Sequence, residues 1–162
     1  MKPWDQRPFE IRNLFNPAFC GLILERAIRA YQEEEPRGMP FSLTLVVLPL
    51  CLQREARETL ARGNRSYFLK ILAAHPQMLV DFPRRATDML PFAFEALGLL
   101  MHMKVVMVTP EGRLQIDPKG VRKSDAGSPE TIACQRVARF LGKQFAQIGD
   151  ALTIYATLGV RP

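Results

Sequence analysis

The stretch PFAFEALGLLMHMKVVMVTPEGRLQID (residues 91–117) decides the fold expected for this chain. Its first part, residues 91–104, places apolar side chains at helical spacing and predicts a helix. Its second part is rich in strand-forming residues over 105–109 and 113–117, on either side of a turn that contains glycine. This arrangement predicts a β-hairpin directly after the helix.

Two shorter helices are expected just before this stretch, over residues 66–75 and 82–90, the second with Asp81 as a cap. Three short helices followed by a two-stranded wing is the order of a winged helix. Residues 66–117 are therefore interpreted as a winged-helix-like segment. The alternative is a helical subdomain with an incidental hairpin.

The N-terminal part of the chain predicts further helices. Asn16 followed by Pro17 is a good helix start, and apolar residues then recur at helical spacing to form one stripe. Residues 43–52 are apolar all round and should be buried on every side. We expect a helix kinked at Pro49 there, with a strand as the alternative. A short helix over 53–60 follows.

The C-terminal part also reads as helix. The sequence Ser-Pro-Glu at residues 128–130 opens a long helix to about residue 148, which Gly149 ends. Asp150 caps a last short helix over 151–158, and Gly159 stops it. The expected fold class is mainly α with a small β-hairpin, a winged-helix-like domain with flanking N- and C-terminal helices. The 162 residues suit a single domain built from residues 16–60, 66–117 and 128–162.

Composition describes a protein without a membrane anchor or disulfide framework. The three cysteines Cys20, Cys51 and Cys134 lie far apart in apolar stretches, and they predict buried reduced thiols. The first twelve residues are charged throughout and lack the apolar core of a signal peptide. The apolar run over 43–52 is far shorter than the roughly 20 residues of a membrane-spanning helix. We therefore expect a cytoplasmic protein with no membrane contact.

Candidate catalytic residues are scarce. The two histidines, His75 and His102, have no Cys, Asp or His neighbour at metal-ligand spacing, and no glycine-rich phosphate loop or nucleophile elbow occurs. The sequence thus predicts no catalytic, cofactor-binding or metal-ligating residue, and we expect that the protein is not an enzyme.

Basic residues are more suggestive, because the formal net charge is +6. Within and just after the winged-helix-like segment, the candidate contacts with DNA are Arg84, Arg85, Lys104, Arg113, Lys119, Arg122 and Lys123. The helix over 91–104, where base-reading side chains would lie, is almost entirely apolar. The basic residues therefore predict contact with phosphates without sequence readout, and the alternative is ordinary solvated charge.

Apolar residues indicate contact with protein. The helix over 91–104 suits a subunit interface, although core packing also explains its composition. The chain stays apolar almost to its end, so we expect that end to be docked in this protein's own core or against another subunit. The candidate partner contacts are Phe92, Phe94, Tyr155, Leu158, Val160 and Arg161.

Four sequence stretches, in order, carry a family resemblance. They are LFNPAFCGLIL (14–24), MPFSLTLVVLPLCL (39–52), PFAFEALGLL (91–100) and FLGKQFAQIGDALTIYATLGVRP (140–162). Together they resemble the middle component of bacterial three-component ABC-ATPase conflict systems, a small protein encoded between an SMC-like ATPase and an effector. Lamassu-type antiphage systems are the best-known relatives. Leu158 stands where the family ending usually has tryptophan.

The resemblance implies a non-catalytic subunit that links an SMC-like ABC ATPase to an effector, a nuclease or other toxic enzyme. ATP and magnesium would be bound by the ATPase. We therefore expect an adaptor or scaffold subunit of an antiphage or anti-plasmid defence complex, with non-specific contact to double-stranded DNA. The alternative is a stand-alone winged-helix transcriptional regulator, which would need a polar recognition helix that this chain lacks.

Overall fold

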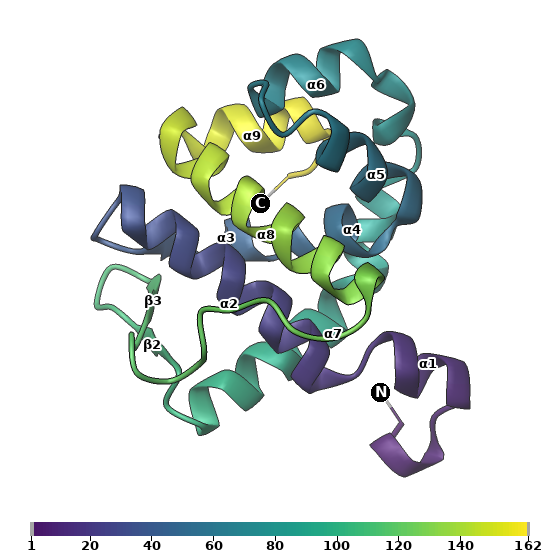
Figure 1. Ribbon diagram of the computed structural model, residues 1–162, viewed down its shortest axis with the longest axis vertical. Coiled ribbons are helices and arrows are strands. Elements are labelled where there is room, and N and C mark those ends of the chain that lie inside the picture. Colours follow the sequence, from purple (N-terminus) through teal and green to yellow (C-terminus); the bar gives the residue numbers. More distant parts are fainter. Residues whose placement is uncertain (1, 162) are drawn as a thin grey trace.

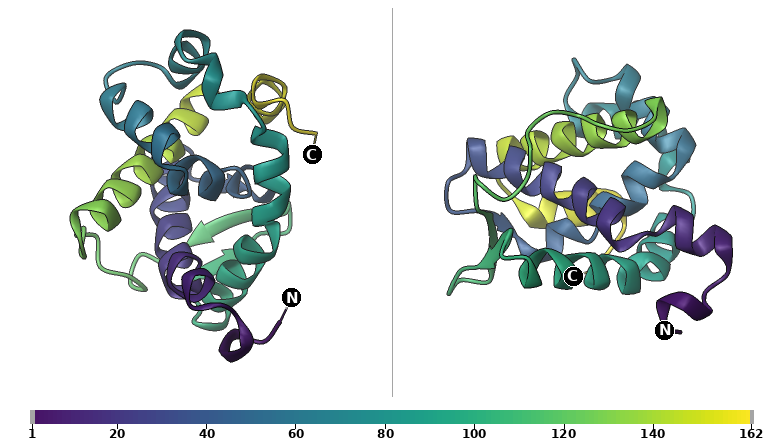
Figure 2. Two further views of the ribbon diagram at one scale, coloured as in Figure 1. Left: turned by 90° about the vertical axis from the view of Figure 1, so that its right-hand side faces the viewer. Right: turned by 60° about the horizontal axis from the view of Figure 1, so that its bottom comes forward.

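One long helix, α2 (Pro17–Glu34), forms the centre of the structure, a computed structural model that describes residues 2–161. It lies between two other long helices, α7 (Phe82–His102) and α8 (Pro129–Ile148), which pack on its two sides (Figure 2). The remaining elements are η1 (Trp4–Gln6), α1 (Phe9–Leu14), β1 (Met39–Pro40), α3 (Phe41–Thr44), α4 (Val47–Leu52), α5 (Arg54–Arg62), α6 (Phe68–Ala74), η2 (Pro76–Leu79), β2 (Val106–Val108), β3 (Arg113–Ile116) and α9 (Ala151–Leu158) (Figure 1). The expectation of a mainly helical fold with a small antiparallel sheet is confirmed.

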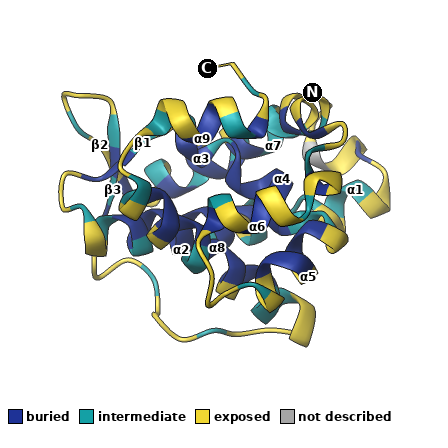
Figure 3. Cartoon of the chain, turned by 90° about the horizontal axis from the view of Figure 1, so that it is seen from above, coloured by how far each residue is buried: buried dark blue, intermediate teal, exposed yellow. Residues whose placement is uncertain are grey.

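Helix α2 begins where the sequence predicts it, since the Asn16 side chain accepts a hydrogen bond of 2.8 Å from the backbone N–H of Ala18. The expected apolar stripe is largely buried, but it is only part of the buried surface of this helix. Nearly every residue from Cys20 to Tyr31 is buried, whichever way its side chain points, because other helices cover α2 on both sides (Figure 3).

The closest approach in this layered packing lies between α2 and α8. A Cβ atom added at Gly142 would lie only 2.0 Å from the backbone oxygen of Ala27. Glycine at this position therefore lets the backbones of α8 and α2 meet directly, without a side chain between them.

The apolar run over 43–52 is buried, as expected, and it is helical rather than extended. The position of its break differs from the prediction. The regular α-helix is interrupted by a turn at Leu45 and Val46, whose N–H groups bond to carbonyls three residues earlier, and Pro49 lies in the first turn of α4. A proline is tolerated in a first turn, because the backbone N–H that it lacks would have no partner within the helix.

Helix α7 also corrects the sequence analysis, which expects two helices that meet at Pro91. The structure has one continuous helix with Pro91 inside it. Pro91 lies on the exposed side, while Ala86, Ala93 and Leu97 on the other side stay packed in the core across the interruption. Tertiary packing therefore overrides the local preference for a break. Asp81 makes no side-chain cap and has a positive φ of 54°.

The predicted hairpin is confirmed as β2 and β3, paired antiparallel with Val106 opposite Ile116. A third strand, β1, joins it to give the order β1-β3-β2. The winged-helix interpretation is not confirmed. Within residues 2–161, the turn that should separate the second and third helices is absent because α7 runs through it, and the hairpin pairs with a strand from outside the 66–117 segment.

The other predicted helices lie within two residues of their expected bounds, as α5, α6, α8 and α9. The caps of α8 and α9 are formed by the expected residues. Ser128 accepts a hydrogen bond from the N–H of Thr131, and Asp150 accepts hydrogen bonds from the first turn of α9. Gly149 and Gly159 end the two helices with φ of 70°. Across the part of the chain that the structure describes, no helix combines the length and apolar character needed to span a bilayer.

Candidate protein-interaction surface

A groove of about 590 Å³ lies between α3, α7 and the end of the chain; we name it the α7 groove. Its lining is mainly apolar, with one charged side chain. The lining residues are Phe41, Ser42, Leu45, Val46, Pro83, Ala86, Thr87, Leu90, Tyr155, Gly159, Val160 and Arg161. A concave, mainly apolar surface with a few polar groups is typical of a binding site.

The local structure after α9 brings the end of the chain to this groove. Gly159 takes a positive φ, and the N–H of Val160 donates a 3.0 Å hydrogen bond to the backbone oxygen of Tyr155. The turn places Gly159 beside Pro83 at the start of α7. The chain end therefore forms one wall of the groove, and α3 and α7 form the others.

Aromatic residues mark the rim. The Phe41 and Phe94 rings are stacked with their centroids 6.2 Å apart, yet Phe41 is 37% exposed and Phe94 is 48% exposed. Beyond Phe94, the exposed side of α7 continues through Gly98 and the half-buried Met101, at helical spacing from Pro91. The four positions on this face of α7 (Pro91, Phe94, Gly98 and Met101) carry no charged side chain. Exposed apolar surface continuous with a groove is typical of protein contacts.

The predicted partner contacts divide into three groups. Tyr155, Val160 and Arg161 line the groove, and Phe94 lies at its rim. Phe92 points elsewhere, and its ring stacks on Phe15 with centroids 4.2 Å apart.

The third group is Leu158, which does not line the groove; it is 1% exposed and lies in the core of this chain. Ile154 and Tyr155 are also buried, and the Tyr155 hydroxyl forms a hydrogen bond with Ser42. Of the two alternatives for the docked end, the structure thus supports docking of α9 in this chain's own core. Residues such as Phe41 and Pro83 were missed by the sequence analysis, because no local signal indicates that they meet across the fold.

The predicted DNA contacts do not form one patch. Arg84 lies in the first turn of α7 and Lys104 lies just after its last residue, about 30 Å apart along the helix axis at 1.5 Å per residue. Two of the arginines bind backbone carbonyls: Arg85 donates to the oxygen of Met78 at 3.0 Å, and Arg113 donates to that of Gly38 at 2.8 Å.

The other three, Lys119, Arg122 and Lys123, are all exposed in the loop over residues 117–128. Buried charged residues of α2 hold the backbone of that loop in place. The Glu25 carboxylate is fully buried and accepts hydrogen bonds from Arg26 at 2.7 Å and from Arg29 at 2.6 Å. The same two guanidinium groups reach the loop, since Arg26 donates to the oxygen of Ser124 and Arg29 to that of Val121. The side chains of a buried ion cluster thereby fix the path of an exposed basic loop.

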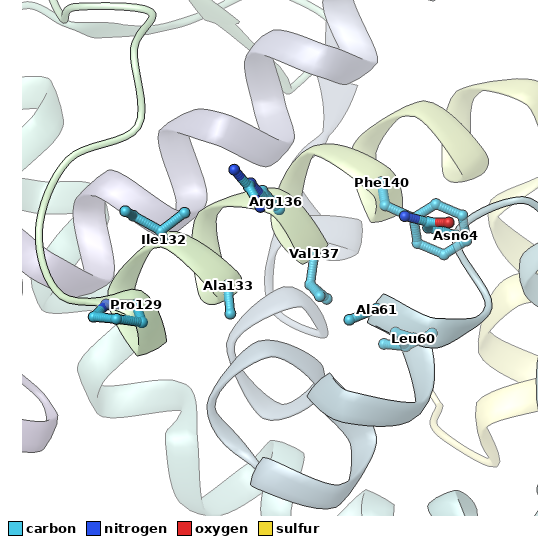
Figure 4. A pocket seen from close by; sticks show the side chains of 9 residues that line it. All are labelled: Leu60, Ala61, Asn64, Pro129, Ile132, Ala133, Arg136, Val137 and Phe140. Atoms are coloured by element: carbon cyan, nitrogen blue, oxygen red, sulfur yellow. The ribbon is translucent and has the colours of Figure 1, made fainter.

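A smaller pocket, of about 210 Å³, lies between α5 and α8 (Figure 4). Its volume is below the range of about 300–1,000 Å³ that small-molecule sites occupy. Its lining residues are Leu60, Ala61, Asn64, Pro129, Ile132, Ala133, Arg136, Val137 and Phe140.

Metal-ligating and nucleophilic side chains do not gather at either pocket. Among residues 2–161, no group of three or more His, Cys, Asp or Glu side chains is placed to hold a metal ion. The three thiols are free and buried, and burial raises the pKa of Cys20 to about 12 and that of Cys51 well above its ordinary value. Buried thiols held in the protonated form are poor nucleophiles.

Comparison with protein families gives a match over nearly the whole chain. The chain matches, over residues 4–162, the family described as ABC-three component (ABC-3C) system Middle Component 3. No curated protein and no solved structure matches the chain.

Proposed function

Because this chain belongs to the Middle Component 3 family of ABC-three component systems, we propose that it is the adaptor subunit that joins the ABC ATPase of such a system to its effector. A middle component of a multi-component system has partner subunits. The proposal adds how they are held: the ATPase and the effector bind different parts of this chain, which acts by assembly and carries out no reaction itself. ATP and magnesium belong to the ATPase.

The single observation that supports this mechanism is the α7 groove with its aromatic rim. Phe41 and Phe94 remain substantially exposed although both are large apolar side chains. Burying such a ring against a partner releases on the order of 25 cal/mol for each Å² of apolar surface removed from water. Aromatic side chains around an apolar groove are typical of the anchors that dominate binding energy at protein interfaces.

The resemblance to Lamassu-type systems belongs to the same proposal. We infer that the ATPase is SMC-like, that the effector is a nuclease or another toxic enzyme, and that the complex acts in the cytoplasm against phage or plasmids. The alternative of a stand-alone winged-helix regulator has no support in the fold. In the described residues, α7 is one continuous, largely apolar helix, and no separate recognition helix precedes the hairpin.

The experiment that tests the proposal is recovery of the tagged chain from its native host, with and without nuclease treatment, followed by mass spectrometry. The expected result is an ABC ATPase that stays bound after the nuclease. Recovery of the chain alone, or of partners that nuclease releases, would overturn the adaptor function.

A further inference from the structure

A second surface is formed by α8 and the loops beside it, and α8 lies on the opposite side of α2 from α7 (Figure 2). It is built from three segments rich in basic residues: residues 118–124, residues 131–148 and residues 62–67. Acidic residues lie beside them, and two of these are paired within the chain: Asp125 with Arg136 and Arg139, and Glu130 with Arg57. We name it the α8 surface. These segments are far apart in the sequence, so their basic residues form a single positive surface only if the fold brings the segments together.

Contacts between the segments show that it does. On one side of α8, Arg139 donates a 2.8 Å hydrogen bond to the backbone oxygen of Lys123. On the other side, the N–H of Phe68, just after the 62–67 loop, donates a 2.7 Å hydrogen bond to the Gln144 side chain. Asn64 also lines the same small pocket as Arg136 (Figure 4). Helix α8 therefore runs between the two basic loops, at the front of the molecule in Figure 1.

The positive charges on this surface are accessible to solvent. The exposed basic residues are Arg62, Arg65, Lys119, Arg122, Lys123, Arg136 and Lys143. Within the described part of the chain, two of these seven form ion pairs, Arg136 with Asp125 and Lys143 with Glu34, each at 3.6 Å. Both cations are largely exposed, at 73% for Arg136 and 57% for Lys143, although Asp125 itself is only 19% exposed and is shared with Arg139. Ion pairs with such exposed cations contribute little to stability.

We propose that the α8 surface binds the sugar-phosphate backbone of double-stranded DNA. Arg136 and Lys143 are two turns apart on one side of α8, a rise of about 10.5 Å. Measured along the duplex axis, each strand carries one phosphate per about 3.4 Å, so this rise corresponds to about three base pairs when α8 lies along the duplex. The guanidinium groups of Arg62, Arg65 and Arg122 can add forked hydrogen bonds to phosphate oxygens. Contacts of this kind depend on charge and carry no base sequence.

Duplex DNA fits this surface better than an acidic protein segment does. The charges are spread over three segments and do not gather around one anchoring site. The apolar pocket among them, at about 210 Å³, is small. The basic loop is also rigidly placed, because Arg26, Arg29 and Arg139 hold its backbone from within the protein. A preformed array of cations loses little entropy when it meets a charged rod.

The inference does not depend on the adaptor function, and it replaces the contact set expected from the sequence. Lys119, Arg122 and Lys123 remain, and residues of α8 and of the 62–67 loop join them. Arg84, beside the α7 groove, is not part of the α8 surface. It therefore supplies a matched control for Arg136, because both are exposed arginines on long helices with one weak aspartate pair each, at 3.9 and 3.6 Å.

The test is fluorescence anisotropy of a labelled 20-bp duplex titrated with the full chain at several salt concentrations. With about four phosphate contacts, the slope of log affinity against log salt should be about −3.6. Arg136→Gln should reduce the magnitude of that slope by about 0.9, and Arg84→Gln should leave it unchanged. The triple variant Arg122→Gln, Arg136→Gln and Lys143→Gln should lower affinity at least about tenfold at low salt.

Melting temperatures of the variants show whether each remains folded, and changes at exposed positions should leave them unaltered. Equal effects of Arg136→Gln and Arg84→Gln, or no binding of the duplex at 50 mM salt, would overturn the proposal. Capture of the ATPase is measured in parallel, so that failure of the DNA-binding proposal can be told apart from failure of the adaptor function. The triple variant should capture the ATPase as well as the wild-type chain does. If the triple variant instead loses capture and the wild type binds no DNA, the α8 surface is a protein interface.

Discussion

Phe41, the first residue of α3, stacks its ring on Phe94 of α7 with an angle of 7° between the planes. The two residues are more than fifty positions apart, and both keep a large exposed fraction. The pair fixes the rim of the α7 groove, because each ring limits the movement of the other. Two aromatic rings held in place before a partner arrives provide a preorganised apolar contact.

Replacing one ring should therefore impair assembly more than folding. We expect Phe94→Ser to weaken binding of the partner subunit that occupies the α7 groove, the ATPase or the effector, by about tenfold or more, as truncation of an interface anchor does. Its melting temperature should change little, because the side chain is about half exposed. Tyr67→Ser is the control, since Tyr67 is also an exposed aromatic, at 72%, and lies outside the groove. Equal capture by both variants, measured by surface-immobilised binding, would show that the rim takes no part.

Replacing glycine by alanine should have opposite effects on the free energy of unfolding at two positions. Gly142→Ala should lower the free energy of unfolding by about 3 kcal/mol or more, because the new methyl group meets the Ala27 backbone. Gly98→Ala should raise it by about 0.5–1 kcal/mol, because that position in α7 faces open space and alanine favours helix. Urea denaturation measures both. A stable Gly142→Ala protein would contradict the close packing of α2 on α8.

The buried ion cluster of α2 should be sensitive to loss of its acid. Glu25→Gln removes the negative charge that Arg26 and Arg29 share, and we expect a loss of about 3–5 kcal/mol in the free energy of unfolding. Glu58→Gln breaks an exposed pair with Arg54 and should cause no measurable change. The comparison uses chemical denaturation of both variants. A Glu25→Gln protein as stable as Glu58→Gln would mean that the cluster contributes nothing to stability.

The cysteines should be unreactive until the protein unfolds. Burial raises the pKa of Cys20 to about 12, so at pH 8 its thiol stays protonated in the native state. A thiol-specific chromogenic reagent should therefore detect almost no free thiol at pH 8, and all three in guanidinium chloride. As the pH rises from about 9 toward 12, the unfolded chain loses this proton first, so the folded state should lose stability. Rapid reaction of one thiol in the native protein would contradict the burial of the cysteines.

Much of the fold could be predicted because its signals are local. Caps at Asn16, Ser128 and Asp150 act within one helical turn, and each makes the expected hydrogen bond. The hairpin is equally local. Pro49 and Pro91 misled the sequence analysis, because the cost of a proline in a helix depends on its position and on the packing around it. The burial of α2 on all sides depends on α7 and α8, which lie far away in the sequence.

The candidate surfaces, too, could be predicted only where the sequence signal is local. Tyr155, Val160 and Arg161 could be selected from an unusual apolar chain end, and they line the α7 groove. Their neighbours Phe41 and Pro83 could not be, because only tertiary structure brings α3 and α7 to that end. The basic residues were predicted as one set from a winged helix. Because α7 is continuous, Arg84 and Arg85 lie at its start and Lys104 lies just after its end, so these charges do not meet on one face.

One measurement tests the adaptor function most directly. The ABC ATPase of the system is tagged and its effector is co-expressed, with and without this chain, and the amount of effector recovered on the tag is compared after nuclease treatment. The account predicts that the effector is recovered with the ATPase only when this chain is present, and that Phe94→Ser reduces the recovery. Equal recovery of the effector in the absence of this chain would contradict the account.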